Sequence, residues 1–85
     1  MNISETEFKY MKEFITRDMA CMLIRDFGMT MEQALRAVYN SRTFELLGNP
    51  ESGFYYQSPQ YVYWYLKEEV KTGKFSPSPT FDRSE

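Results

Sequence analysis

The chain has 85 residues, of which 42% are hydrophobic and 26% charged, and this length fits a single small domain. One cysteine excludes an intrachain disulfide, and the lack of histidine removes the commonest transition-metal ligand and the usual base at neutral pH. A net charge of −2 counts against sequence-independent nucleic-acid binding, which rests on a basic face.

Export and membrane insertion are also disfavoured. The first residues lack a basic region followed by an apolar stretch, which is the pattern of a signal peptide. The longest apolar run, Met19–Ile24, is far shorter than the roughly 20 residues of a membrane span. A lone cysteine fits a reducing compartment. We therefore expect a cytoplasmic protein with no membrane segment.

The first expected helix is long and runs from about Glu5 to Phe27. Ser4 and Glu7 have the spacing of a capping box at its start, and Gly28 is placed to close it in a left-handed conformation. Apolar residues three or four positions apart form one stripe, and charged residues of alternating sign form the solvent side. The apolar stripe holds Phe8, Met11, Ile15, Met19 and Met22, and the charged row holds Glu5, Lys9, Glu13 and Arg17.

The second half of this helix is apolar on most sides, so we expect it to be covered from more than one direction. Cys21 lies inside this apolar run and is expected to be a small buried residue and not a nucleophile. Methionines gather around the end of the helix, where adaptable core packing is the expected role and a promiscuous binding groove is the alternative. They are Met19, Met22, Met29 and Met31.

Two shorter helices should follow. Thr30 and Gln33 form a second capping box, and the helix that they start should end near Asn40. Ser41 is a suitable N-cap for a third helix, Arg42–Leu47. The inward-facing residues should be Met31, Ala34, Leu35 and Val38 in the first of these helices, and Phe44 and Leu47 in the second.

This helix–break–helix outline is compatible with a small helix-turn-helix DNA-binding regulator, which needs basic or amide side chains at the start of its reading helix. Arg36, Asn40 and Arg42 are the candidates, and Glu45 opposes them. We keep DNA binding as the alternative function, whereas the preferred function has no nucleic-acid partner.

The segment Asn49–Gly53 predicts a turn, because its proline fixes φ and its glycine can adopt a positive φ. Phe54–Gln57 is expected to be extended. The pair Ser58–Pro59 supplies the N-cap and the first position of the last helix, which should run to about Lys71.

Aromatic residues are concentrated in this part of the chain, with seven of them between Phe54 and Tyr65. Around the last helix they point in most directions, so a core on one side cannot bury them all. Because Tyr and Trp anchor interfaces, we expect a partner-binding surface; alternatively, the rings pack on the first helix and the remaining tyrosines tolerate exposure. The expected surface consists of Tyr55, Tyr56, Tyr61, Trp64 and Tyr65.

Catalytic patterns are absent from the sequence. Glu68 and Glu69 are adjacent on a helix and face different sides, and Asp26 and Glu51 have no evident partner. No glycine-rich phosphate loop occurs. We therefore expect no enzyme activity, no metal and no cofactor.

Several short sequence words between Met31 and Leu66 are unusual. They are Val38-Tyr39-Asn40-Ser41 and Tyr55-Tyr56-Gln57-Ser58-Pro59, and they are accompanied by Thr43-Phe44, Tyr61-Val62, Ala34, Leu47, Pro50 and Gly53. In these residues the chain resembles a family of short, functionally unassigned proteins of gut-type anaerobic bacteria. The resemblance implies a small helical protein with no established activity, cofactor or catalytic residue. By analogy, small bacterial proteins of this kind often pair with another small protein, as in toxin–antitoxin systems.

These patterns predict an all-α fold, a small bundle of three to four helices in residues 1–74, with a long N-terminal helix and an aromatic C-terminal helix packed against it. The Pro/Ser-rich tail at 75–85 is expected to be mobile or loosely docked. The expected function is a non-catalytic protein–protein interaction module that forms a homodimer or pairs with another small protein. The expected core is Phe8, Met11, Ile15, Met22, Leu23, Leu35, Val38, Phe44, Leu47, Val62 and Leu66.

Overall fold

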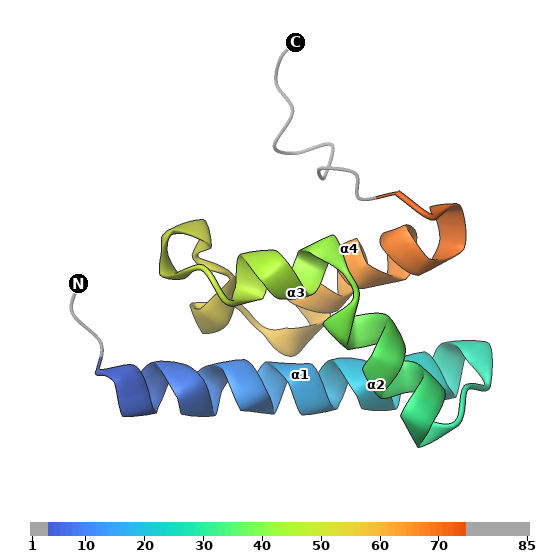
Figure 1. Ribbon diagram of the computed structural model, residues 1–85, viewed down its shortest axis with the longest axis horizontal. Helices are drawn as coiled ribbons and strands as arrows, with labels where there is room; N and C mark the ends of the chain where they lie inside the picture. Colours follow the sequence, from blue (N-terminus) through green and yellow to red (C-terminus); the bar gives the residue numbers. More distant parts are fainter. Residues whose placement is uncertain (1–3, 75–85) are drawn as a thin grey trace, which may run out of the picture.

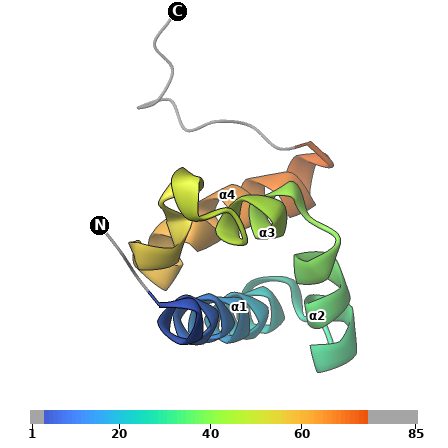
Figure 2. The same cartoon turned by 60° about the vertical axis from the view of Figure 1, so that its left-hand side comes forward.

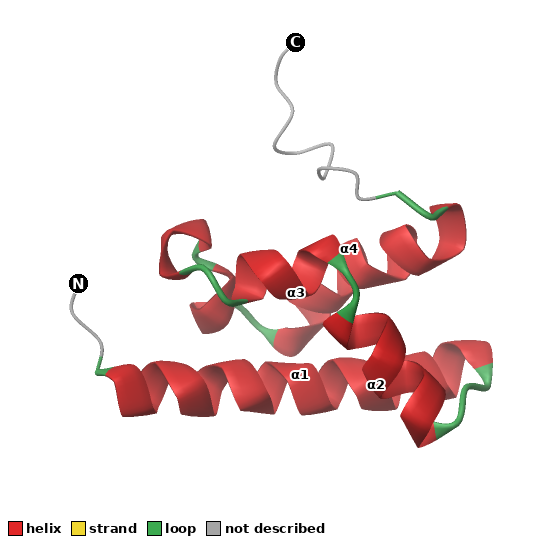
Figure 3. Ribbon diagram, in the orientation of Figure 1, coloured by secondary structure: helices red, strands yellow, loops and turns green. Residues whose placement is uncertain are grey.

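The computed structural model describes residues 4–74, and within them the chain is built from helices (Figure 1, Figure 3). They are α1 (Glu5–Phe27), α2 (Met31–Tyr39), α3 (Arg42–Leu47), the short 3-10 helices η1 (Pro50–Ser52) and η2 (Phe54–Tyr56), and α4 (Pro59–Thr72). The predicted all-α fold with a long N-terminal helix is confirmed. The prediction for the tail at 75–85 lies outside the described residues.

The helix boundaries follow from local capping chemistry. In the capping box of α1, the Glu7 backbone N–H donates to the Ser4 hydroxyl, and the Ser4 backbone N–H donates to the Glu7 carboxylate. The same pair of bonds joins Thr30 and Gln33 at the start of α2. Gly28 closes α1 at φ 68°, and its N–H donates to the carbonyl of Ile24. The sequence-based boundaries at these positions are confirmed.

The segment that was expected to be extended, Phe54–Gln57, is helical instead, because η2 occupies most of it. The Ser52 hydroxyl accepts a hydrogen bond from the Phe54 backbone N–H at 3.1 Å and itself donates to the Leu46 carbonyl. Gly53 reverses the chain at φ 76°. These contacts fold the segment back over α3, and they bury the first two rings of η2.

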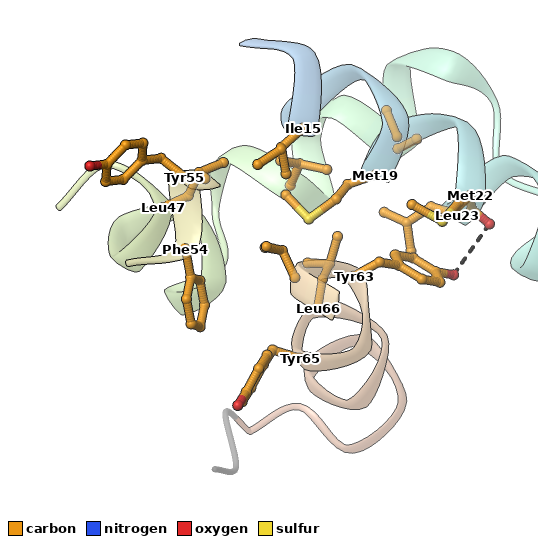
Figure 4. Close-up of a cluster of buried hydrophobic side chains, with 14 residues drawn as sticks. Ile15, Met19, Met22, Leu23, Leu47, Phe54, Tyr55, Tyr63, Tyr65 and Leu66 are labelled. Carbon is orange, nitrogen blue, oxygen red and sulfur yellow. Dashed lines mark hydrogen bonds between the residues drawn. The ribbon is translucent and has the colours of Figure 1, made fainter. Parts of the chain in front are cut away.

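The helices enclose one core between α1 and the elements that cover it. In Figures 1 and 2, α3 and α4 lie over the long α1, and α2 lies beside its C-terminal half. Figure 4 shows Ile15 and Met19 reaching from α1 toward Leu66 of α4. The buried hydrophobic residues are Ile15, Met19, Ala20, Met22, Leu23, Ala34, Val38, Leu47, Phe54, Tyr55, Val62, Tyr63, Tyr65 and Leu66.

Most of the predicted core is confirmed. Seven of its residues are buried, and four others are partly buried and packed against them, namely Phe8, Met11, Leu35 and Phe44. The second half of α1 is covered by both α4 and α2, as expected. Cys21 is the exception, because it is exposed and not buried. It lies on the side of α1 away from the buried Met19 and Leu23, so the apolar run around it gave the wrong prediction.

Candidate interaction surface

The five aromatic residues that the sequence placed on one surface are separated by the fold. Tyr65 and Tyr55 are buried, with 1% and 6% of their surface exposed, and Tyr61 is half-buried. Tyr56 and Trp64 are exposed, at 59% and 38%. The prediction of a shared exposed surface is therefore wrong for Tyr55 and Tyr65.

The folded η2 segment explains why these rings are buried. Phe54 of η2 packs against Tyr65 with ring centroids 5.1 Å apart, and Tyr55 packs edge-to-face on Phe8 of α1 at the same distance. Because α4 is covered by α1 on one side and by α3 and Phe54 of η2 on another, it can bury more of its circumference than a one-sided helix. The surplus of rings in α4 is mostly core packing.

Asp26 at the end of α1 has partners that the sequence did not indicate. The Tyr63 hydroxyl of α4 donates to Oδ2 of Asp26 at 2.7 Å. The same hydroxyl lies 3.2 Å from the carbonyl oxygen of Met22, and Figure 4 draws this second hydrogen bond as a dashed line. The Arg25 guanidinium donates to Oδ1 of Asp26 at 2.7 Å, and Lys67 Nζ lies 3.8 Å from Oδ2. This group of polar contacts joins the C-terminal half of α1 to α4.

The electrostatics of this group follow from these contacts. The hydrogen bond from Arg25, and then the one from Tyr63, hold the pKa of the Asp26 carboxyl well below its usual value. Burial, and then the bond to Asp26, raise the pKa of the Tyr63 hydroxyl above its usual value. The carboxylate therefore stays ionised and the phenol stays protonated near neutral pH, so neither group is poised to exchange a proton.

Glu69 of α4 caps the N-terminus of α3. Its carboxylate accepts from the Arg42 backbone N–H at 2.6 Å, from the Thr43 backbone N–H at 3.1 Å and from the Thr43 hydroxyl at 2.8 Å. The Phe44 N–H is taken by Ser41, the expected N-cap. The role of Glu69 had no local signal in the sequence, because the contact spans 26 residues.

The outer side of α1 carries a row of exposed residues that take no part in the buried core. The spacing alternates between three and four residues, and two members are aromatic: Tyr10 is 71% exposed and Phe14 is 51% exposed. The whole row is Glu7, Tyr10, Phe14, Arg17 and Cys21, all of them exposed; we call it the outer stripe. Its spacing is visible in the sequence, but the apolar stripe of the same helix gives the stronger signal.

Two apolar grooves flank the outer stripe. The first, of about 480 Å³, lies between α1 and η2 and is lined by Tyr10, Met11, Glu13, Phe14, Ile15, Arg17, Tyr55, Tyr56 and Gln57. The second, of about 490 Å³, lies between α1 and the α2–α3 region and is lined by Lys12, Glu13, Thr16, Arg17, Ala20, Met31, Leu35, Tyr39 and Phe44. Glu13 and Arg17 line both grooves. They therefore form a charged ridge between the two apolar grooves.

Residues 4–74 show neither a metal-binding cluster nor a membrane-spanning helix. These residues contain no group of three or more Cys, Asp or Glu side chains that could hold a metal ion. No helix in the same range is long and apolar enough to cross a membrane. Comparisons of the chain with protein-family models, with curated proteins and with solved structures find no match.

Proposed function

We propose that this protein is a non-catalytic protein–protein interaction module, which self-associates or pairs with another small protein. The observation that carries the proposal is the pair of aromatic residues on the outer stripe, Tyr10 and Phe14, set beside a groove whose far wall includes the exposed Tyr56. Burying a ring of this size is worth roughly 1.5–3 kcal/mol. A partner that covered this side of α1 would gain that free energy from several rings at once.

The roles of the charged residues also favour a binding role over catalysis. Asp26 is held by a guanidinium and a phenol, and Glu69 caps α3. Both carboxylates are therefore committed to holding helices together. The groove residues Glu13 and Arg17 are exposed on the ridge, where charges commonly set the orientation of a partner.

The DNA-binding alternative gains no support from the geometry of α3. The helix has six residues, and the Glu69 carboxylate lies at its N-terminus, where a phosphate would be repelled. Arg42 pairs with Glu45 at 2.7 Å, so its charge is already partly neutralised. We therefore favour a protein partner.

The test compares two serine substitutions of exposed phenylalanines on α1. Phe14→Ser removes a ring of the outer stripe, and Phe27→Ser removes a ring that lines neither groove. Sedimentation measures self-association of each purified protein, and affinity capture with each protein as bait identifies partners, which are then purified and titrated. We expect association to be lost in Phe14→Ser and kept in Phe27→Ser, with unchanged circular dichroism. A wild-type protein that remains monomeric and binds no protein would refute the proposal.

A further inference from the structure

We propose that the partner of the outer stripe is the outer stripe of a second copy of this chain, with the two α1 helices antiparallel. This inference rests on the proposed function and adds the identity and orientation of the partner. It is carried by the order of charged and aromatic residues along the stripe.

The stripe has the geometry of a helix–helix seam. Alternating steps of three and four residues are the spacing of the a and d positions of a coiled coil. At about 100° per residue, Glu7, Tyr10, Phe14, Arg17 and Cys21 fall within a sector of about 80°. The buried residues of α1, such as Ile15 and Met19, lie on the opposite side. The helix thus has two stripes that could pack: the buried one, which packs in the core of the domain, and the exposed outer stripe.

The charges of the stripe disfavour a parallel pair. In a parallel pair each residue meets its own copy, so Glu7 would face Glu7 and Arg17 would face Arg17. Like charges directly opposed across a seam repel each other. A parallel dimer would therefore place one repulsive contact at each end of its aromatic layers.

The antiparallel arrangement turns the same residues into complementary pairs. When Tyr10 lies opposite Phe14 of the second copy, the equal spacing of the stripe brings Glu7 opposite Arg17 of that copy. The two-fold axis repeats both contacts. Two aromatic layers then form the centre of the seam, with an ion pair at each end.

A shift by one heptad, which is two layers of the stripe, breaks this match. It would place Phe14 opposite Arg17 and Tyr10 opposite Cys21, and it would set Glu7 against the half-buried Ile24. A carboxylate facing an apolar side chain loses water without gaining a partner. The charges therefore select the alignment with Tyr10 opposite Phe14.

The grooves on both sides of the stripe enlarge the contact. A helix with its side chains is roughly 10–12 Å across, so a partner helix on the stripe would also cover the rims of the grooves. Tyr56 stands exposed at one rim, and Met31 and Tyr39 stand exposed at the other. Stable interfaces bury at least roughly 1,200 Å², and a seam of about three turns is short, so we expect a dissociation constant in the micromolar range.

Charge reversal tests the alignment. Arg17→Glu would place two carboxylates opposite each other at both ends of the seam, and we expect it to weaken dimerisation at least about tenfold in sedimentation. The double variant Glu7→Arg/Arg17→Glu exchanges the charges and should restore the wild-type dissociation constant. Lys9→Glu changes the net charge by the same amount away from the stripe, so it is the matched control and should have little effect. Circular dichroism verifies that each variant is folded, since Glu7→Arg also removes part of the capping box.

The outcomes separate this inference from the proposed function. An Arg17→Glu effect no larger than that of Lys9→Glu, or a double variant that stays monomeric, would overturn the antiparallel pair. A wild-type chain that is monomeric but binds a different protein through Phe14 would also overturn it, while it would leave the interaction module intact.

Cys21 reports the orientation independently. In a parallel dimer the two thiols would be adjacent, whereas in the antiparallel alignment they lie about 27 Å apart along the axis at 1.5 Å per residue. Oxidation of the wild-type dimer should therefore give no rapid disulfide. In a Cys21→Ser background, a mixture of Tyr10→Cys and Phe14→Cys chains should cross-link faster than either variant alone. Rapid cross-linking through Cys21 would refute the antiparallel orientation.

Discussion

Thr43 and Glu69 lie 26 residues apart in the chain, yet the carboxylate of Glu69 accepts hydrogen bonds from both the backbone N–H and the hydroxyl of Thr43. A helix as short as α3 has little stability of its own. Its N-terminal N–H groups find acceptors on α4 through Glu69 and on the preceding loop through Ser41. The cap therefore joins the start of α3 to α4.

Removal of this cap should destabilise the domain. We expect Glu69→Ala to lower the free energy of unfolding by about 1–3 kcal/mol, because two backbone N–H groups and a buried hydroxyl lose a charged acceptor. Urea denaturation measures the change. Glu68→Ala is the matched control, since Glu68 pairs only distantly with Lys71, at 3.8 Å, and it should change the free energy by less than about 0.5 kcal/mol. Equal effects of the two substitutions would show that the cap contributes nothing.

The Tyr63 hydroxyl should contribute to stability separately from its ring. Tyr63→Phe keeps the buried ring but removes the hydrogen bond to Asp26, so we expect a loss of about 1–2 kcal/mol. The same substitution at the exposed Tyr56 should be close to neutral, and urea denaturation of both variants tests the difference. A neutral Tyr63→Phe would mean that water replaces the phenol at Asp26 without cost.

The pH dependence of stability should reveal the role of Asp26. Its pKa is lowered in the folded protein, first by Arg25 and then by Tyr63, so its stabilising effect is complete above the pKa of the unfolded chain and is lost as the pH falls through the folded pKa. We expect the melting temperature of the wild type to exceed that of Asp26→Asn at pH 7. This difference should shrink between about pH 5 and pH 2. A difference that stays constant over this range would contradict the assigned interaction.

Two neighbours on α4 should respond very differently to truncation. Tyr65 is almost fully buried against Phe54, so Tyr65→Ala should cost about 3–5 kcal/mol of unfolding free energy. Trp64 is partly exposed, and Trp64→Ala should cost clearly less. Thermal or chemical denaturation gives both values. If Trp64→Ala proves the more damaging substitution, then Trp64 and not Tyr65 is the core residue of this turn.

The boundaries of the helices could be predicted because the signals that set them are local. Ser4 and Glu7, or Thr30 and Gln33, lie three residues apart and satisfy each other whatever the rest of the chain does. Gly28 likewise needs only its own backbone freedom to close α1.

The surface could not be predicted, because exposure depends on which elements pack where. Tyr65 is buried by η2, a segment that looked extended from its own residues. Cys21 is exposed because the helices that cover α1 leave that side free, although its sequence neighbours are apolar. The capping role of Glu69 depends on the packing of α3 against α4, which no local pattern encodes.

The two sides of α1 differ in burial. Ile15, Met19 and Leu23 are buried in the core, whereas Tyr10 and Phe14 are exposed on the outer side. Substitutions on well-separated faces usually act additively. The outward side can therefore be varied without loss of the fold, and protein engineers can use it as a site for grafting a binding function onto this scaffold.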